Sequence, residues 1–371
     1  MVQFSGAGRF VWNKCLAMSL SRLESKQRIL WYEEMAFWLT LWRSSEDYGF
    51  LKSVHSQILQ QKLKDLDRAF KDGFDKNQPL KRMPAFKRKS VSDSFRYPQG
   101  FKLAADKHQI YLPKIGWVKY FNSQKIVGTP KNVTVSRGGK HWFVSVQVEI
   151  ETAKPQHPSK SMIGLDLGIK RFVTFSDGTA ISPLNHFRKW EKKLAFLQRG
   201  LSRKEKCSAN WRKQKQKVSR QHEKIARGRQ DFLHKVSTQI SKNHAMIVIE
   251  DLKVRNMSAS ATGTLEQPGV NVRAKSGLNK SILDQGWASF VSMLEYKQEW
   301  RGGEVLKVPP HHTSQTCPVC SHVSPENRRS QSEFECTACH YRENADFVGA
   351  LNVLARGHRV LACGELALAT L

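Results

Sequence analysis

The sequence lacks any apolar run of about eighteen residues, the length at which a segment becomes a candidate transmembrane helix. The N-terminus also lacks the charged region and apolar core that make up a secretory signal. Both absences argue against a membrane-spanning or secreted protein. We therefore expect a soluble intracellular chain with no membrane partner.

Cysteine is present but is not arranged as a disulfide framework. Of the seven cysteines, Cys15, Cys207 and Cys363 are scattered, and the other four form two pairs with two residues inside each pair. This usage is typical of proteins in a reducing compartment, where structural disulfides are rare.

Acidic residues are scarce relative to basic ones. The 371 residues include 61 Lys and Arg against 32 Asp and Glu, which gives a formal net charge of +29 and a pI near 10.0. Such an excess repels itself unless a polyanion neutralises it, and a phosphate backbone is the usual one. The length is sufficient for two or three domains, and a hydrophobic content of 40% is sufficient for a folded core. We expect nucleic acid as its partner.

The first half of the chain predicts helices followed by strands. Apolar residues recur at helical spacing through residues 9–70, and the Trp-rich stripe at 31–42 is better explained as core than as a base-stacking platform. Residues 101–151 alternate like strands, which favours a small antiparallel barrel or sheet. Two prolines in residues 152–160 indicate a linker.

The second half predicts an α/β domain interrupted by long helices. The segments with the apolar composition of buried strands are 162–168, 171–175, 245–250 and 305–308. Helices are expected at 186–242, 283–300 and 344–356, the last of them ended by Gly357. Residues 256–280 are polar and contain Gly and Ser, so we expect them to be mobile.

The most specific motif consists of two cysteine pairs. Cys317-Pro-Val-Cys320 and Cys336-Thr-Ala-Cys339 are separated by fifteen residues, which is the spacing of two zinc knuckles. Four thiolates complete a tetrahedral site without help from a histidine. We therefore predict one structural Zn²⁺.

Three acids occupy apolar settings in which a carboxylate is costly to bury. Asp166 lies within a predicted strand, Glu250 ends another, and Asp346 begins a predicted helix. Together they predict a site for two Mg²⁺ ions, which could hold the attacking water and the leaving oxygen of a phosphodiester. Two of the acids also have a structural explanation, since Asp346 could stabilise a helix N-terminus and Glu250 is followed by Asp251, whereas the strand offers Asp166 no obvious partner.

Two basic regions are candidates for phosphate contact. The first is loop-rich and lies between residues 72 and 100, where a solvated linker is an equally good explanation; the second is the helical region 186–242, where acids are nearly absent. The residues expected to contact nucleic acid are Lys81, Arg82, Lys87, Arg88, Lys89, Arg203, Lys204, Arg212, Lys213, Lys217 and Arg220.

These motifs resemble the TnpB proteins of bacterial and archaeal insertion sequences, which are related to the compact type V CRISPR effectors. The most specific similar segments are Ile163–Lys170, Val248–Leu252, Thr313–Cys320 and Asn344–Asn352, and further ones are Arg9–Asn13, Ser56–Phe70 and Ser94–Tyr97. The resemblance therefore extends over nearly the whole chain.

The resemblance implies an α+β multidomain protein that contains an RNase H-like α/β nuclease domain of RuvC type. Asp166, Glu250 and Asp346 would be its metal-binding catalytic acids. The implied parts are a wedge β-barrel (76–155) with a helical recognition insert (9–75), the nuclease domain (160–310 and 343–371) and an inserted zinc ribbon that binds target nucleic acid (311–342). Since only eight residues precede the insert, we expect residues 1–8 to be the residual start of a barrel without its first strand.

The implied function is RNA-guided cleavage of double-stranded DNA in a prokaryotic cytoplasm or nucleoid. A guide RNA from the transposon end and a short adjacent motif would select the target, and two metal ions would hydrolyse it. Two alternatives stay open, namely an RNA-guided repressor that does not cleave and an RNase H-like transposase. The full set of three acids and four cysteines disfavours the repressor. For the oligomeric state, we favour a monomer.

Overall fold

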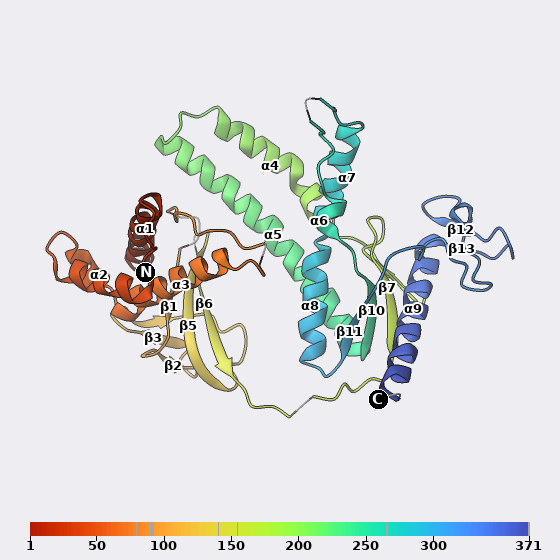
Figure 1. Ribbon diagram of the computed structural model, residues 1–371, viewed down its shortest axis with the longest axis horizontal. Helices are drawn as coiled ribbons and strands as arrows, with labels where there is room; N and C mark the ends of the chain where they lie inside the picture. Colours follow the sequence, from red (N-terminus) through yellow and green to blue (C-terminus); the bar gives the residue numbers. More distant parts are fainter. Residues whose placement is uncertain (79, 90–92, 140, 154, 265, 370–371) are drawn as a thin grey trace. The chain divides into compact units, whose positions relative to one another are not determined.

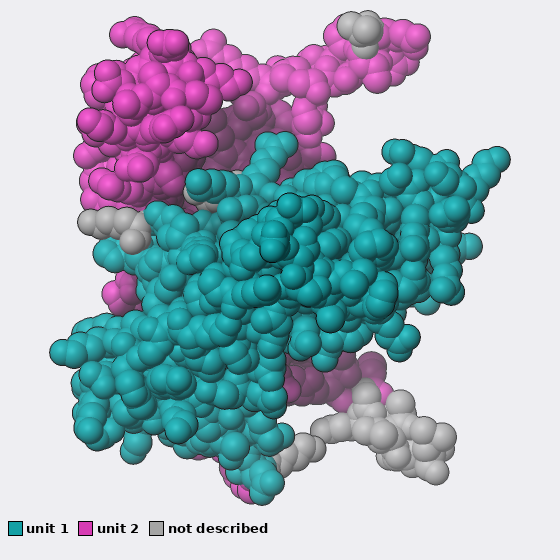
Figure 2. Space-filling view, turned by 90° about the vertical axis from the view of Figure 1, so that its left-hand side faces the viewer, with its two compact units in different colours: residues 1–152 teal, residues 153–371 magenta. Residues whose placement is uncertain are grey.

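The computed structural model describes residues 1–78, 80–89, 93–139, 141–153, 155–264 and 266–369 (Figure 1). The chain forms two compact units, Met1–Thr152 and Ala153–Leu371, which Figure 2 shows in separate colours. The boundary falls within the predicted linker at 152–160. No helix among the described residues combines the length and the apolar character needed to cross a membrane.

Unit 1 begins with helices that share one core. They are α1 (Val2–Glu24), α2 (Tyr32–Ser44), the 3-10 helix η1 (Gly49–Ser53) and α3 (Ser56–Phe74). The aromatic stripe is confirmed as core, because Met35, Leu39 and Trp42 of α2 are buried against the neighbouring helices.

The expectation for residues 1–8 differs from the structure. Residues 2–8 are the first turns of α1 rather than a remnant of a barrel. Phe4, Ala7 and Val11 explain the difference, because they repeat at helical spacing and are buried in the core of unit 1.

The second half of unit 1 consists of two antiparallel sheets. The strands are β1 (Ser94–Tyr97), β2 (Lys102–Ala104), β3 (Gln109–Leu112), β4 (Gly116–Lys119), β5 (Thr129–Gly138) and β6 (His141–Glu149). Their orders are β1-β5-β6 and β2-β3-β4. Buried Phe95, Tyr97 and Val135 belong to the same core as the helices, so these sheets and helices fold as one body.

Unit 2 is built on a five-stranded sheet of order β11-β10-β7-β8-β9. The strands are β7 (Met162–Asp166), β8 (Val173–Phe175), β9 (Ala180–Ile181), β10 (Met246–Glu250) and β11 (Glu304–Val308). Strands β7, β10 and β11 run parallel. Parallel strands are covered on both faces, which explains their continuous apolar sequences.

Helices cover both faces of this sheet. The helices of unit 2 are α4 (His186–Ser202), α5 (Ala209–Asn243), α6 (Val254–Met257), α7 (Val272–Gln285), α8 (Trp287–Glu299) and α9 (Ala345–Ala369). One face packs against α5 and α8, and the other against α9 (Figure 1). Helix α4 and the first half of α5 pair through Leu194, Val218 and Ile225 and extend away from the sheet (Figure 1).

Three details of the predicted helices were wrong. The segment 256–280, which was expected to be mobile, contains the start of helix α7. The single helix expected at 283–300 is divided by Gly286, whose φ of +72° separates α7 from α8. Helix α9 also continues through Gly357 rather than ending there. A Cβ at Gly357 would lie 2.5 Å from a methyl group of Val248, so this glycine permits close packing of the helix on the sheet.

Candidate active site and metal centre

The sheet brings Asp166 and Glu250 to the same edge. They are the last residues of the neighbouring parallel strands β7 and β10, in which Leu165 lies opposite Ile249. Alternate residues of a strand point to one face. Since Met162 of β7 packs in the core under α9, Asp166, four residues later, faces α9 as well. The same alternation directs Glu250 to that face.

Helix α9 brings the third acid to this edge. The side-chain oxygen of Asn344 accepts a hydrogen bond of 3.1 Å from the backbone N–H of Asp346 and thereby caps the helix. Two glycines allow the helix to approach closely. A Cβ at Gly164 would lie 2.4 Å from the backbone of α9, and a Cβ at Gly349 would lie 3.3 Å from the Asp166 carboxylate.

The three carboxylates share one electrostatic environment. Burial and, to a smaller extent, the negative charges of Glu250 and Asp346 raise the pKa of Asp166 to about 7, against an opposing effect of Arg328. Burial also raises the pKa of Glu250. A carboxyl group that is so reluctant to ionise beside two other acids is suited to receive a divalent cation. Carboxylate oxygens are the ligands that Mg²⁺ prefers, so the donor chemistry suits the ion, and the Mg²⁺ site stays a prediction.

A loop anchored to α9 holds Glu250 in place. The hydroxyl of Thr313 donates to a Glu250 carboxylate oxygen at 2.5 Å, and this bond lowers the pKa that burial raises. The amide of Asn352 on α9 donates to the backbone carbonyls of Thr313 and Thr316, both at 2.7 Å. Thr313 and Asn352 are 4% and 6% exposed, so their positions are fixed by packing.

No role was predicted from the sequence for Thr313, Asn352 or two nearby arginines. The positive charges of Arg328 and Arg356 both lower the pKa of Glu250. Arg328 belongs to the segment between the two cysteine pairs, and nothing in the sequence distinguishes it from the adjacent Arg329. For Asn352, a signal was available, because it is a polar residue in an otherwise apolar helix pattern.

The raised pKa of Asp166 predicts how stability depends on pH. Between about pH 4 and 7 the folded state retains a proton that the unfolded chain has released. The free energy of unfolding in EDTA should therefore fall by roughly 2–3 kcal/mol between pH 5 and 8 because of this group alone. Chemical denaturation of Asp166→Asn should lack this component, and parallel pH profiles for the two proteins would contradict it.

The four predicted cysteines come together. All four sulfur atoms lie within 4.8 Å of one another, with 3.6 Å between Cys317 and Cys339 and 3.5 Å between Cys320 and Cys336. A tetrahedral Zn²⁺ with Zn–S bonds of about 2.3 Å requires sulfur atoms about 3.8 Å apart. The cluster can therefore hold zinc with only small adjustments.

The two halves of this cluster have the same local geometry. Ser321 and His340 follow the second cysteine of each pair with φ of +61° and +58°, and each donates its backbone N–H to the carbonyl of the first cysteine. The strands β12 (Glu333–Glu335) and β13 (Arg342–Asn344) flank the second pair. Buried Asn327 bridges the halves, since it donates to the His322 carbonyl and accepts from the Thr337 N–H.

The predicted basic residues lie in different surroundings. All the predicted contact residues in the α4–α5 hairpin are exposed, namely Arg203, Lys204, Arg212, Lys213, Lys217 and Arg220. Arg82, Arg88 and Lys89 of the loop-rich region are also exposed, whereas Lys81 pairs with Asp72 at 3.1 Å and Lys87 is half-buried. Nucleic-acid contact by these residues stays a prediction.

Two protein-family models match the chain. The family OrfB_IS605, described as "Probable transposase", matches residues 145–261, which contain Asp166 and Glu250. The model "Cas12f1-like, TNB domain" matches residues 287–353, which contain the four-cysteine cluster and Asp346.

Named relatives cover almost the whole chain. The chain is 55% identical to "Putative RNA-guided DNA endonuclease InsQ" of Escherichia coli K12, over 99% of this chain and 90% of that protein. It is 33% identical to a "Putative RNA-guided DNA endonuclease" of Streptomyces pristinaespiralis, over 97% of this chain and 86% of the relative.

The fold is similar to a solved structure. The Cas12f1 chain in the complex of Cas12f1 with sgRNA and target DNA aligns with a TM-score of 0.55 at 16% identity, over 95% of this chain and 81% of the other. This similarity supports the predicted mixed α/β multidomain architecture.

Proposed function

The chain belongs to the TnpB family of RNA-guided DNA endonucleases, and from this premise we propose that Asp166, Glu250 and Asp346 are the catalytic acids of an RNase H-like, RuvC-type domain. The observation that carries the proposal is the convergence of three carboxylates from β7, β10 and α9 on one edge of the sheet of unit 2. No role in folding explains a buried Asp166 whose pKa is raised by two neighbouring acids.

The proposed domains follow from this assignment. Unit 2 would be the nuclease domain, with the four-cysteine cluster as a zinc ribbon inserted between the second and third acids in chain order. Unit 1 would be the recognition and wedge lobe, which contacts the guide RNA and the short motif beside the target. Such an enzyme would work in the prokaryotic cytoplasm or nucleoid.

The proposed reaction is hydrolysis of a DNA phosphodiester, in which water adds across one P–O bond. Two Mg²⁺ ions held by the three acids would supply an activated water and neutralise charge on the phosphate. Thr313 orients Glu250, and Arg328 contributes positive charge near Asp166, where the scissile phosphate would lie. The four cysteines would hold a structural Zn²⁺ and take no part in the chemistry.

The proposal is tested with the protein purified together with RNA transcribed from its own locus. The substrate is a plasmid library in which a guide-matched target lies beside randomised motifs, incubated with Mg²⁺ or with EDTA. Cuts that depend on both guide and Mg²⁺ are expected, and they would reveal the motif. Binding without cutting would indicate a repressor, and strand joining without RNA would indicate a transposase.

Replacing Thr313 by valine should reduce cleavage about ten- to a hundredfold, since the hydrogen bond to Glu250 is lost while the shape is retained. The Mg²⁺ concentration for half-maximal cleavage should rise in parallel. Thr313→Ser is the matched control, because it keeps the hydroxyl and should retain most of the activity. Equal Mg²⁺ dependence in the valine variant and the unmodified protein would contradict this role.

A further inference from the structure

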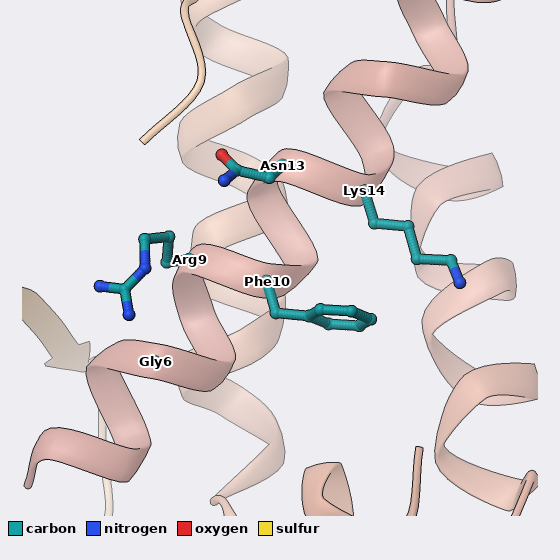
Figure 3. Close-up of a pocket in the computed structure, with 5 residues that line it drawn as sticks. All are labelled: Gly6, Arg9, Phe10, Asn13 and Lys14. Atoms are coloured by element: carbon teal, nitrogen blue, oxygen red, sulfur yellow. The ribbon is translucent and has the colours of Figure 1, made fainter. Parts of the chain in front are cut away.

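A hollow lies on one face of helix α1 in unit 1, far in sequence from the acids. Gly6, Arg9, Phe10, Asn13 and Lys14 line it, and its volume is about 500 Å³ (Figure 3). Arg9 and Asn13 extend to one side of the helix, and Phe10 and Lys14 to the other (Figure 3). We call this hollow the α1 groove. It is an open depression in the helix surface, which suits a flat group that stacks on the surface.

A basic segment is fastened to one side of α1. The indole N–H of Trp12 donates to the Ala85 carbonyl at 3.1 Å. The Asn13 amide donates to the Lys87 carbonyl at 3.0 Å and accepts from the Lys87 N–H at 2.8 Å. We call residues 80–89 the basic strap. Because its backbone is already ordered on α1, binding a ligand there costs little further conformational entropy.

The basic strap offers free cations beside exposed apolar side chains. In the part of the chain that the structure describes, Arg82, Arg88 and Lys89 are exposed and form no ion pair. Phe86 and Leu80 are 52% and 78% exposed. Basic and apolar exposed groups close together on one segment are the composition that binds phosphates and unpaired bases together.

Lys87 has a different role from its neighbours. Its ammonium group lies 3.4 Å from the centre of the Trp12 ring, and burial lowers its pKa to about 8, assisted by the charge of Lys62. This lysine fixes the strap on α1 by a cation–π contact rather than facing solvent. The strap is therefore attached to α1 at Ala85 and Lys87, while most of its other side chains stay exposed.

The opposite side of the α1 groove is aromatic and rigid. The ring of Phe10 packs against Tyr48 and Phe50 with centroids 5.5 and 5.2 Å apart. The Lys14 ammonium lies 3.9 Å from the centre of the Tyr48 ring and 4.9 Å from that of Trp42. An aromatic wall that carries a cation suits a nucleobase, which presents a flat π-system next to a phosphate.

We propose that the α1 groove and the basic strap form a binding site for a single-stranded segment of the guide RNA. An unpaired base would lie in the groove against Phe10, and the adjoining phosphates would contact Arg88 and Lys89. The site requires an unpaired base because bases inside a duplex cannot enter a groove. This inference rests on the proposed function, which supplies the RNA.

The guide RNA is the favoured occupant rather than target DNA. A chain of net charge +29 suits a polyanion that remains bound, and in the proposed function the guide RNA would be that partner. Phe86 and Leu80 are also exposed, and because exposed apolar side chains mark interaction sites, a partner that stays bound is expected to cover them. Target DNA would leave these groups uncovered between binding events.

Gly6 allows a sharp test. A Cβ at Gly6 would have the Arg9 guanidinium as its nearest contact, at 3.8 Å, so a larger side chain can enter the α1 groove without disturbing the core. We expect Gly6→Phe to fill the groove and weaken binding of the locus-encoded guide RNA at least about tenfold. Gly277→Phe is the matched control, because Gly277 lies in helix α7 with nothing within 4 Å of an added Cβ, and it should bind as the unmodified protein does.

The strap is tested by its charge. The double variant Arg88→Ala, Lys89→Ala should bind guide RNA more weakly, and the slope of log affinity against log salt should be smaller by about one to two. Lys107→Ala, an exposed lysine in the β2–β3 turn, is the control and should leave the slope unchanged. Binding is measured on the full chain in EDTA without DNA, after thermal unfolding has shown that each variant is folded.

The outcomes separate the two proposals. If the unmodified protein does not bind its guide RNA, the proposed function fails. If it binds but Gly6→Phe binds equally well, the inference about the α1 groove is overturned while the proposed function stands. A defect of Gly6→Phe that appears only in target-DNA binding by the loaded complex would make DNA the occupant and overturn the inference as well.

Discussion

Replacing Asp166 by asparagine is expected to reduce DNA cleavage by more than about a thousandfold, while binding of guide RNA and target DNA remains. Asp166 is the acid on which the charges of Glu250 and Asp346 both act, so it is central to the proposed cation site. Without the metal's stabilisation of the transition state, the activation free energy should rise by several kcal/mol. Each 1.4 kcal/mol of activation free energy slows the reaction about tenfold. The measurement is single-turnover cleavage in Mg²⁺, with target binding measured separately in EDTA.

The chain offers a matched control for this substitution. Asp251 is adjacent to Glu250 but pairs with Lys253 at 2.5 Å, outside the group of three acids. Asp251→Asn should therefore cleave within about twofold of the unmodified protein, since an exposed ion pair contributes little. Equal losses in both variants, or loss of target binding together with cleavage in Asp166→Asn, would contradict the assignment.

Replacing the zinc ligand Cys336 by serine is expected to produce the second largest effect. Cys336 is buried, and three thiolates cannot complete the tetrahedral site, so zinc should be lost. Since metal binding contributes about 10 kcal/mol or more to small zinc folds, residues 311–342 should lose their structure. Cleavage should then fall at least about a hundredfold, because Thr313 and Arg328 lose their fixed positions next to the acids.

Zinc content, limited proteolysis and cleavage test this expectation together. Cys207→Ser is the control, because Cys207 is exposed in the α4–α5 turn and lies outside the cluster. It should retain one zinc per chain and normal cleavage. A Cys336→Ser protein that cuts at the normal rate would show that the ribbon is independent of the active site.

The sequence predicted the elements whose composition and length are unambiguous. Buried parallel strands give continuous apolar segments, so β7, β10 and β11 were found and the acids ending β10 and beginning α9 were located. Two Cys-x-x-Cys pairs have few structural explanations besides a metal site, and their sulfur atoms do lie together. Asp166 was placed inside its strand, and the structure has it as the last residue.

The remaining features depend on contacts between segments that are distant in sequence. A hydrogen bond from Thr313 to Glu250 spans 63 residues, and no local pattern encodes it. Gly357 has the local signature of a helix end, but contact with Val248 decides its role. Likewise the composition of the basic strap suggests a solvated loop, whereas hydrogen bonds to Trp12 and Asn13 determine its conformation.

The packing of α9 on the sheet also has a consequence for synthesis on the ribosome. The strand that carries Asp166 is made 180 residues before Asp346, which at about 5–20 residues per second corresponds to roughly 10–40 s. From the synthesis of Val248, 98 residues before Asp346, the face of the sheet with Met162 and Val248 has no helix to cover it. A nascent chain therefore exposes an apolar surface and cannot assemble the acid cluster until the ribbon has been translated.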